Sequence, residues 1–345
     1  MKIKHYIKSI FLIFTALCIV SGKLYAETIW VVDRFTKELI RVDSDGAREV
    51  IELNDFKTPV DIRVDQRDGS VWVNDMTDFF DSQIMKLSSD GKELFRLSGF
   101  SVLGDAAIDQ RDGSYYAVER MIGEVVKISR DGEELFRIKS LSPIDDLEGM
   151  GCLNKTEGCH ADYDGMDVNL RGIDDIDVSP IDSSVLIADT GSKQLLKFTS
   201  KGKKISSIKD ISEPESLAMG FDGSCWVSNI GGGKVFKVSK DNKKILGKVT
   251  GLNFPFEISV SPVDGTCWVA TRRDLTQISR DGKKILKRVG GFMCPQGLST
   301  INPVDGSFWF ADFYGMEIIK ISREGKVLKK IKGFKRPRFL EVHWY

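Results

Sequence analysis

Four carboxylates at equivalent points of a repeated sequence are the side chains best placed to do chemistry. Asp61, Asp105, Asp175 and Glu257 each stand at the same distance before a turn of the Asp-Gly or Asp-Ser type. Carboxylates that converge on one point repel one another unless a cation lies among them, and ligands that are all oxygen favour Ca²⁺ or Mg²⁺. The pattern predicts a site for one of these metal ions, with a solvated acidic rim as the alternative.

An acidic insertion at about residues 142–171 is the second candidate site. Long loops in compact folds are usually functional or disordered, and we expect this one to form a lid on the face that carries the four carboxylates. Its carboxylates alternate around a turn glycine, as in calcium loops, but the distal glutamate of an EF-hand is absent. A solvated acidic loop is therefore the alternative. The lid residues are His160, Asp162, Asp164 and Asp167.

The cysteines suggest one disulfide and two thiols. Cys152 and Cys159 lie close together within the insertion and could close a small disulfide loop outside the cytoplasm. Cys225 and Cys267 each precede a tryptophan in an apolar run, which favours buried thiols. The sequence does not define the state of Cys294.

A repeat of about forty residues positions these side chains. Val-Asp-Gln-Arg-Asp-Gly-Ser at 64–70 recurs as Ile-Asp-Gln-Arg-Asp-Gly-Ser at 108–114, and related segments begin at 261 and 302. Asp-Gly pairs between alternating apolar runs are typical of hairpin turns, because glycine tolerates the positive φ that such turns require. Each unit predicts four short antiparallel strands, and radial stacking of such units buries both faces of each sheet in a β-propeller.

Seven turn markers predict an all-β protein, a seven-bladed propeller with six blades as the alternative count. The first unit starts at Thr28 with an apolar run typical of a second strand, so it lacks a first strand. Residues 339–344 supply an unclaimed strand of the right kind. We therefore expect the two ends of the chain to close the ring within one blade.

Two series of residues should lie at one face of this propeller. The first series opens the innermost strand of each blade and contains the four carboxylates. Aspartates at strand ends commonly accept hydrogen bonds from nearby turn amides, so we interpret the second series, which ends the second strands, as structural. Its members are Asp33, Asp75, Glu119, Asp189, Asn229, Thr271 and Asp312.

The repeat pattern is most complete at 172–178 with 188–191, and at 295–298 with 311–312. In these segments it resembles NHL-type repeats and the wider group of SMP-30/gluconolactonase and streptogramin lyase-like propellers. The resemblance covers nearly all of the chain after the leader and implies a propeller fold. For a gluconolactonase it implies a metal held by acidic and amide side chains, to which Glu215, Asn229 and Gln296 are the imperfect counterparts.

The first 26 residues have the features of a secretory signal peptide. Three lysines precede an apolar run at 10–20, and a polar stretch then ends at Ala26, a small residue suited to cleavage. The apolar run is shorter than the roughly 20 residues that span a bilayer. We expect one domain over residues 27–345, exported to the periplasm or secreted, with no membrane span after cleavage.

The charge of the chain is balanced overall but uneven along it. The 50 basic and 50 acidic residues cancel, which argues against a nucleic-acid partner. Cleavage of the leader removes four lysines and leaves a net charge of −4, while residues 201–345 hold 26 basic and 14 acidic residues. The acidic excess therefore lies before residue 201, and lysines on exposed strand edges account for part of the asymmetry.

Two functional hypotheses follow. The preferred one is a monomeric, non-catalytic binding or scaffold module that engages a protein or envelope ligand through its acidic, lid-bearing face. The alternative is a metal-dependent hydrolase or lactonase that uses the central carboxylates with Ca²⁺ or Mg²⁺. His160 and His343 are the only histidines after the leader, which is too few for chemistry based on several histidine ligands.

Overall fold

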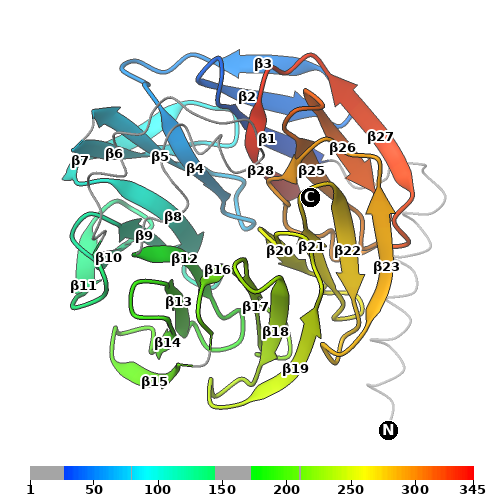
Figure 1. The fold of residues 1–345 in the computed structure, drawn as a ribbon. Helices are drawn as coiled ribbons and strands as arrows, with labels where there is room; N and C mark the ends of the chain where they lie inside the picture. Colours follow the sequence, from blue (N-terminus) through cyan, green and yellow to red (C-terminus); the bar gives the residue numbers. More distant parts are fainter. Residues whose placement is uncertain (1–26, 79, 144–171, 210) are drawn as a thin grey trace, which may run out of the picture.

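The computed structural model describes residues 27–78, 80–143, 172–209 and 211–345, which form seven four-stranded antiparallel sheets. The sheets stand around a common axis as the blades of a β-propeller, with one strand of each blade next to the axis (Figure 1). The predicted seven-bladed fold is confirmed, and the count of six is wrong. Within the described ranges no helix is long and apolar enough to cross a membrane.

The blades follow one another along the chain. In blades 2 to 7 the first strand is the one next to the axis, whereas in blade 1 this place is taken by the C-terminal strand. From the axis outward, blade 1 contains β28 (Pro337–Trp344), β1 (Glu27–Asp33), β2 (Glu38–Asp43) and β3 (Arg48–Ile51). In the same direction, blade 2 contains β4 (Pro59–Val64), β5 (Val71–Asp78), β6 (Asp81–Leu87) and β7 (Glu93–Phe100). Blade 3 contains β8 (Leu103–Ile108), β9 (Tyr115–Glu119), β10 (Glu124–Ile128) and β11 (Glu134–Ile138). Blade 4 contains β12 (Ile173–Val178), β13 (Val185–Asp189), β14 (Gln194–Phe198) and β15 (Lys204–Ile208). Blade 5 contains β16 (Pro214–Met219), β17 (Cys225–Asn229), β18 (Lys234–Val238) and β19 (Ile245–Thr250). Blade 6 contains β20 (Ile258–Val260), β21 (Cys267–Ala270), β22 (Asp274–Ile278) and β23 (Ile285–Gly290). Blade 7 contains β24 (Pro295–Gln296), β25 (Phe308–Asp312), β26 (Glu317–Ile321) and β27 (Val327–Lys332).

The turn between the first two strands of blade 2 shows why the repeat carries glycine. The amide of Gly69 donates a hydrogen bond of 2.8 Å to the carbonyl of Asp65, and Gly69 has a φ of +73°. A Cβ atom at this position would lie 2.7 Å from Nδ1 of His343 in the neighbouring blade. Both the turn conformation and the packing of adjacent blades therefore require glycine here.

The two ends of the chain close the ring. β1 pairs antiparallel with β28, from Glu27 opposite Trp344 to Asp33 opposite Pro337. This pairing gives β1 a partner on the axis side, where an incomplete blade would leave an exposed edge. The closure within blade 1 that the sequence predicts is therefore confirmed.

The core lies between adjacent blades, and the second strands of most blades each contribute a large aromatic side chain to it. Trp72 stacks on Tyr115 of the next blade, with ring centroids 4.6 Å apart and the planes 5° from parallel. Burial of large aromatic surfaces of this kind holds each blade against its neighbours. The tryptophans in this position, all at most 1% exposed, are Trp30, Trp72, Trp226, Trp268 and Trp309.

The described cysteines fall into two classes. Cys225 and Cys267 are free and buried, as expected. Cys294 is disulfide-bonded, and neither of these two cysteines is its partner. Several predictions concern residues outside the described ranges: the disulfide between Cys152 and Cys159, and the lid residues His160, Asp162, Asp164 and Asp167.

Candidate functional site in the central channel

A cavity of about 350 Å³ lies on the propeller axis between the innermost strands. Its size is within the range of ordinary small-molecule sites. Its described lining carries eight carboxyl groups and two guanidinium groups, so acidic side chains outnumber basic ones by six. The acidic residues are Asp61, Asp105, Asp174, Asp175, Asp177, Glu215, Glu257 and Glu341, and the basic residues are Arg63 and Arg338.

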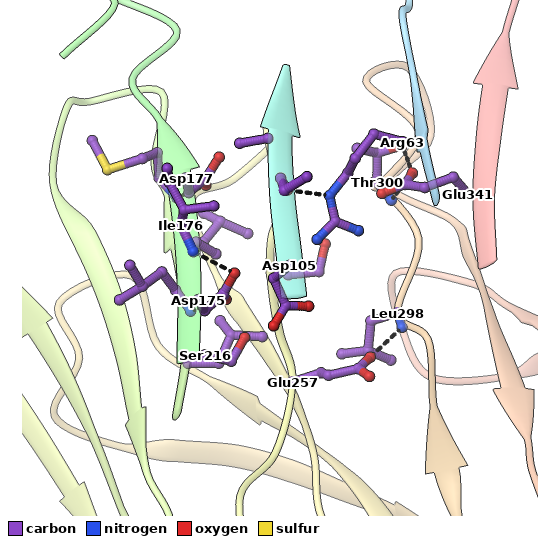
Figure 2. Close-up of a pocket in the computed structure, with 18 of the residues that line it drawn as sticks. Arg63, Asp105, Asp175, Ile176, Asp177, Ser216, Glu257, Leu298, Thr300 and Glu341 are labelled. Atoms are coloured by element: carbon purple, nitrogen blue, oxygen red, sulfur yellow. Dashed lines mark hydrogen bonds between the residues drawn. The ribbon is translucent and has the colours of Figure 1, made fainter. Parts of the chain in front are cut away.

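All four predicted metal ligands line this channel. Figure 2 shows three of them, Asp105, Asp175 and Glu257, reaching toward the axis from three different blades. Asp61 lines the same cavity from β4. Among the described residues, however, no three carboxylate, imidazole or thiolate side chains are grouped so that they could hold a metal ion. Metal binding therefore stays a prediction.

A register shift at the start of an innermost strand enlarges the acidic lining. In blade 4, Ile173 pairs with Asp189 and Asp175 pairs with Ala188, so Asp174 is an extra residue in the ladder. Such a bulge re-aims side chains locally, and both Asp174 and Asp175 line the channel. The innermost strands of blades 2, 3 and 5 carry a shift at the corresponding place.

Four of the carboxylates connect neighbouring blades. Asp175 Oδ2 accepts a hydrogen bond of 2.7 Å from the amide of Leu217 in the next blade. Glu257 Oε2 accepts one of 2.7 Å from the amide of Leu298 (Figure 2). The axis-side edge of an innermost strand has no further strand to pair with, so these carboxylates satisfy its amides. The other two such carboxylates are Asp177, which bonds Met219, and Glu341, which bonds Thr300.

Other acceptors in the channel lack a hydrogen-bond donor among the described residues. Asp61 is the exception, because it is fully buried and forms an ion pair with Arg63, with Oδ1 2.8 Å from Nη1. Asp105 and Glu215 form neither a hydrogen bond nor an ion pair with any other residue that the structure describes. Oε1 of Gln296, a side chain that is only 6% exposed, also lacks a partner among these residues.

Burial and mutual repulsion raise the pKa values of these carboxyl groups. Burial, reinforced by the charges of Asp174 and Asp105, raises the pKa of Glu215 to about 8. Burial raises the pKa of Asp174 to about 6, although Arg120 opposes the shift. The pKa of Asp105 is also raised by burial, against the opposing charge of Arg63. Near neutral pH the channel therefore contains both neutral and ionised carboxyl groups.

Two buried arginines offset part of the negative charge. Arg120 follows β9 and is 8% exposed, and its Nη2 donates a hydrogen bond of 2.7 Å to Asp174 Oδ1. Gly104 leaves space for it, because a Cβ at that position would lie 2.7 Å from Cδ of Arg120. Arg338 on β28 is 6% exposed and lies close enough to lower the pKa of Glu215.

The second series of acidic residues is structural, as predicted. Asp75 Oδ1 accepts a hydrogen bond of 2.6 Å from the amide of Thr58, and its Oδ2 accepts one of 2.8 Å from Gln83 Nε2. Asp312 Oδ1 accepts one of 2.8 Å from the amide of Cys294. In each case the carboxylate fixes the loop that leads into the innermost strand of its own blade.

Sequence reasoning missed part of the channel lining. Asp174, Asp177 and Glu341 were not predicted, and Glu215 was named only as an imperfect metal-ligand counterpart implied by the family resemblance. Asp177 stands two residues after Asp175, and side chains two residues apart on a strand share a face. This two-residue spacing could have predicted that Asp177 and Glu341 face the channel. The bulge that turns Asp174 toward the channel can be recognised only from the strand pairing.

No protein-family model matches the sequence, and no curated protein matches it. Solved structures do match the fold. A functionally unknown protein from Desulfotomaculum acetoxidans has a TM-score of 0.70 at 16% identity, covering 92% of this chain and 98% of that one. Apo AztD from Citrobacter koseri has a TM-score of 0.66 at 14% identity, covering 93% and 99%.

A streptogramin B lyase structure is also similar, with a TM-score of 0.62 at 12% identity, covering 92% of this chain and 91% of that one. At these identities the likeness shows the fold alone. The predicted resemblance to streptogramin lyase-like propellers is thus confirmed at the level of fold. Membership of the NHL or SMP-30 families stays a prediction.

Proposed function

We propose that this protein is an exported, non-catalytic binding protein that engages its ligand through the acidic central channel. One observation carries this proposal: a channel of ligand size retains acceptors that no described residue satisfies, on Asp105, Glu215 and Gln296. For the buried Oε1 of Gln296, the lack of a donor costs about 1–3 kcal/mol. The presence of these acceptors in one cavity is explained if a ligand supplies the missing donors.

The composition of the described lining suits recognition of a charged ligand. Its titratable side chains are carboxyl and guanidinium groups, which complement charge and hydrogen-bond geometry. They project from strands, and several are held by backbone amides, as Asp175 and Glu257 are. Rigid placement of polar groups around a cavity is what a selective binding site needs.

A channel-filling substitution tests the proposal. A chemically diverse fragment library is screened by thermal shift and ligand-observed NMR against the wild type and Ser216→Trp, which places an indole in the channel wall. Ser44→Trp, at an exposed turn in blade 1, is the matched control. We expect fragments that bind the wild type and Ser44→Trp but not Ser216→Trp. Equal binding to all three proteins, or no binding to the wild type, would refute channel binding.

Export is supported by two observations. The leader of residues 1–26 has the composition of a signal peptide, and Cys294 is in a disulfide, which is usual in oxidising compartments. β1 begins at Glu27, directly after the predicted cleavage site. Cell fractionation with N-terminal sequencing should find a mature chain starting at Glu27 outside the cytoplasm. A full-length chain in the cytoplasmic fraction would contradict export.

A metal-dependent hydrolase or lactonase is the second candidate, because all four predicted ligands do line the channel. A panel of lactones, assayed with added Ca²⁺ or Mg²⁺, tests this candidate. Turnover by the wild type that is lost in Asp105→Asn would establish it. A rise in melting temperature with either ion would support metal binding on its own.

A further inference from the structure

We propose that the channel binds an organic cation with several N–H donors, such as a primary diamine or a guanidinium compound, and that Asp105 and Glu215 are its anchoring carboxylates. This inference deepens the proposed function and rests on it. It names the chemical class of the ligand and the side chains that select it.

The free acceptors surround the axis. Asp105 lies on β8, Glu215 on β16 and Gln296 on β24, so three of the seven blades contribute. Carboxylates and amide carbonyls accept hydrogen bonds, and ionised carboxylates favour positive charge. A ligand that donates N–H groups in more than one direction and carries positive charge therefore suits this set.

The described acceptors are not grouped as the ligands of a metal ion are. A bound Ca²⁺ or Mg²⁺ needs its oxygen ligands at about 2.0–2.6 Å, and the described residues form no such group of three. An ammonium or guanidinium donor reaches a carboxylate at about 2.7–2.9 Å, and one molecule can carry several such donors at a distance from one another. Phe256 and Phe339 in the lining offer apolar surface for its carbon skeleton.

Binding of this ligand is coupled to proton release. Glu215 is faced by Asp174 from β12, Asp105 from β8, and the guanidinium groups of Arg120 and Arg338. Burial and the charges of the two aspartates raise its pKa to about 8 against the opposing charges of the two arginines, so much of it is protonated at neutral pH. A cation pairs best with the ionised form and displaces the proton. Affinity should therefore rise between pH 6 and pH 8.5.

Isothermal titration calorimetry on the mature protein tests the inference with four compounds of matched length: 1,5-diaminopentane, 5-aminopentanoate, glutarate and 1,5-pentanediol. We expect the diamine to bind most tightly at pH 8.5, at least tenfold more weakly at pH 6, and with proton release that shows in buffers of different ionisation enthalpy. Asp105→Asn and Glu215→Gln should each weaken it about tenfold, the loss of one charge-assisted hydrogen bond. Asp131→Asn, at an exposed turn of blade 3, is the control and should bind as the wild type does.

The possible outcomes separate the two proposals. If glutarate or pentanediol binds as well as the diamine, or if the diamine binds both channel variants as it binds the wild type, the cation inference is wrong. If the diamine does not bind while library fragments still distinguish Ser216→Trp from Ser44→Trp, the cation inference fails and the binding function stands. If no compound distinguishes them, both proposals fail.

Discussion

The acidic residues that end the second strands and those that open the innermost strands lie at the same end of each blade, yet they behave differently. Asp75 is surrounded by donors, including the amides of Lys57 and Thr58 and the side-chain amide of Gln83. Asp105 forms no hydrogen bond or ion pair with another described residue. The number of hydrogen-bond donors near a carboxylate, and not its residue type, therefore decides whether it is structural or available to a ligand.

The largest expected effect is the loss of a strand-end carboxylate. Asp75→Ala leaves two backbone amides and a glutamine without their acceptor, which we expect to lower the free energy of unfolding by about 3 kcal/mol. Urea denaturation of the variant and the wild type measures this difference. A change within about 0.5 kcal/mol, the range of ordinary surface substitutions, would contradict the structural role.

A carboxylate that joins two blades should have an intermediate effect. Asp175→Ala removes the acceptor for the amide of Leu217 and exposes that amide to the channel, so we expect a loss of about 1–2 kcal/mol. Urea denaturation with Asp105→Ala as the matched channel control gives the comparison. Equal stability of the two variants would show that the hydrogen bond from Leu217 to Asp175 does not stabilise the fold.

The pH dependence of stability tests the raised pKa of Glu215, a channel carboxylate without a described partner. Because the pKa of Glu215 is higher in the folded state, the folded state binds the proton more tightly, and stability falls as pH rises from about 4.5 to about 8. Glu215→Gln removes this part of the dependence and should melt about 2–4 °C above the wild type at pH 9. Calorimetric melting at pH 5, 7 and 9 measures it. A variant whose melting temperature follows the wild type throughout would contradict the raised pKa.

The smallest expected effect is that of Asp105→Asn. The substitution keeps the shape of the side chain and removes a charge that other carboxylates repel, so stability at pH 8 should stay within about 0.5 kcal/mol of the wild type or rise slightly. Urea denaturation at low ionic strength detects the change. A clear loss of stability would place Asp105 among the structural carboxylates and end the contrast with Asp75.

The fold was predictable because its signals are local and repeated. The segments at 64–70 and 108–114 repeat the same turn chemistry, which limits the architecture to a ring of hairpin-built blades. The closing strand could be found because β1 lacked a first strand and residues 339–344 lacked a partner. Both arguments need only the periodicity of the chain and the requirement that sheet edges be covered.

The site was predictable only in part because the distinction within it depends on neighbouring blades. Asp105 and Asp175 are equivalent in sequence, but only Asp175 bonds an amide of the next blade, that of Leu217. Arg120 enters the site through space that Gly104 leaves empty, a relation between two strands. These contacts depend on which strands and blades lie side by side in the fold. A periodic pattern in a single sequence does not reveal them.

A crystal structure of the mature protein with 1,5-diaminopentane at pH 8.5 is the most direct test of the central claim. We predict that the diamine lies in the channel with its ammonium nitrogens about 2.7–2.9 Å from carboxylate oxygens of Asp105 and Glu215. The doubly substituted Asp105→Asn, Glu215→Gln protein, crystallised in the same way, should lack it. A diamine bound away from these residues, or bound equally in the variant, would contradict the account.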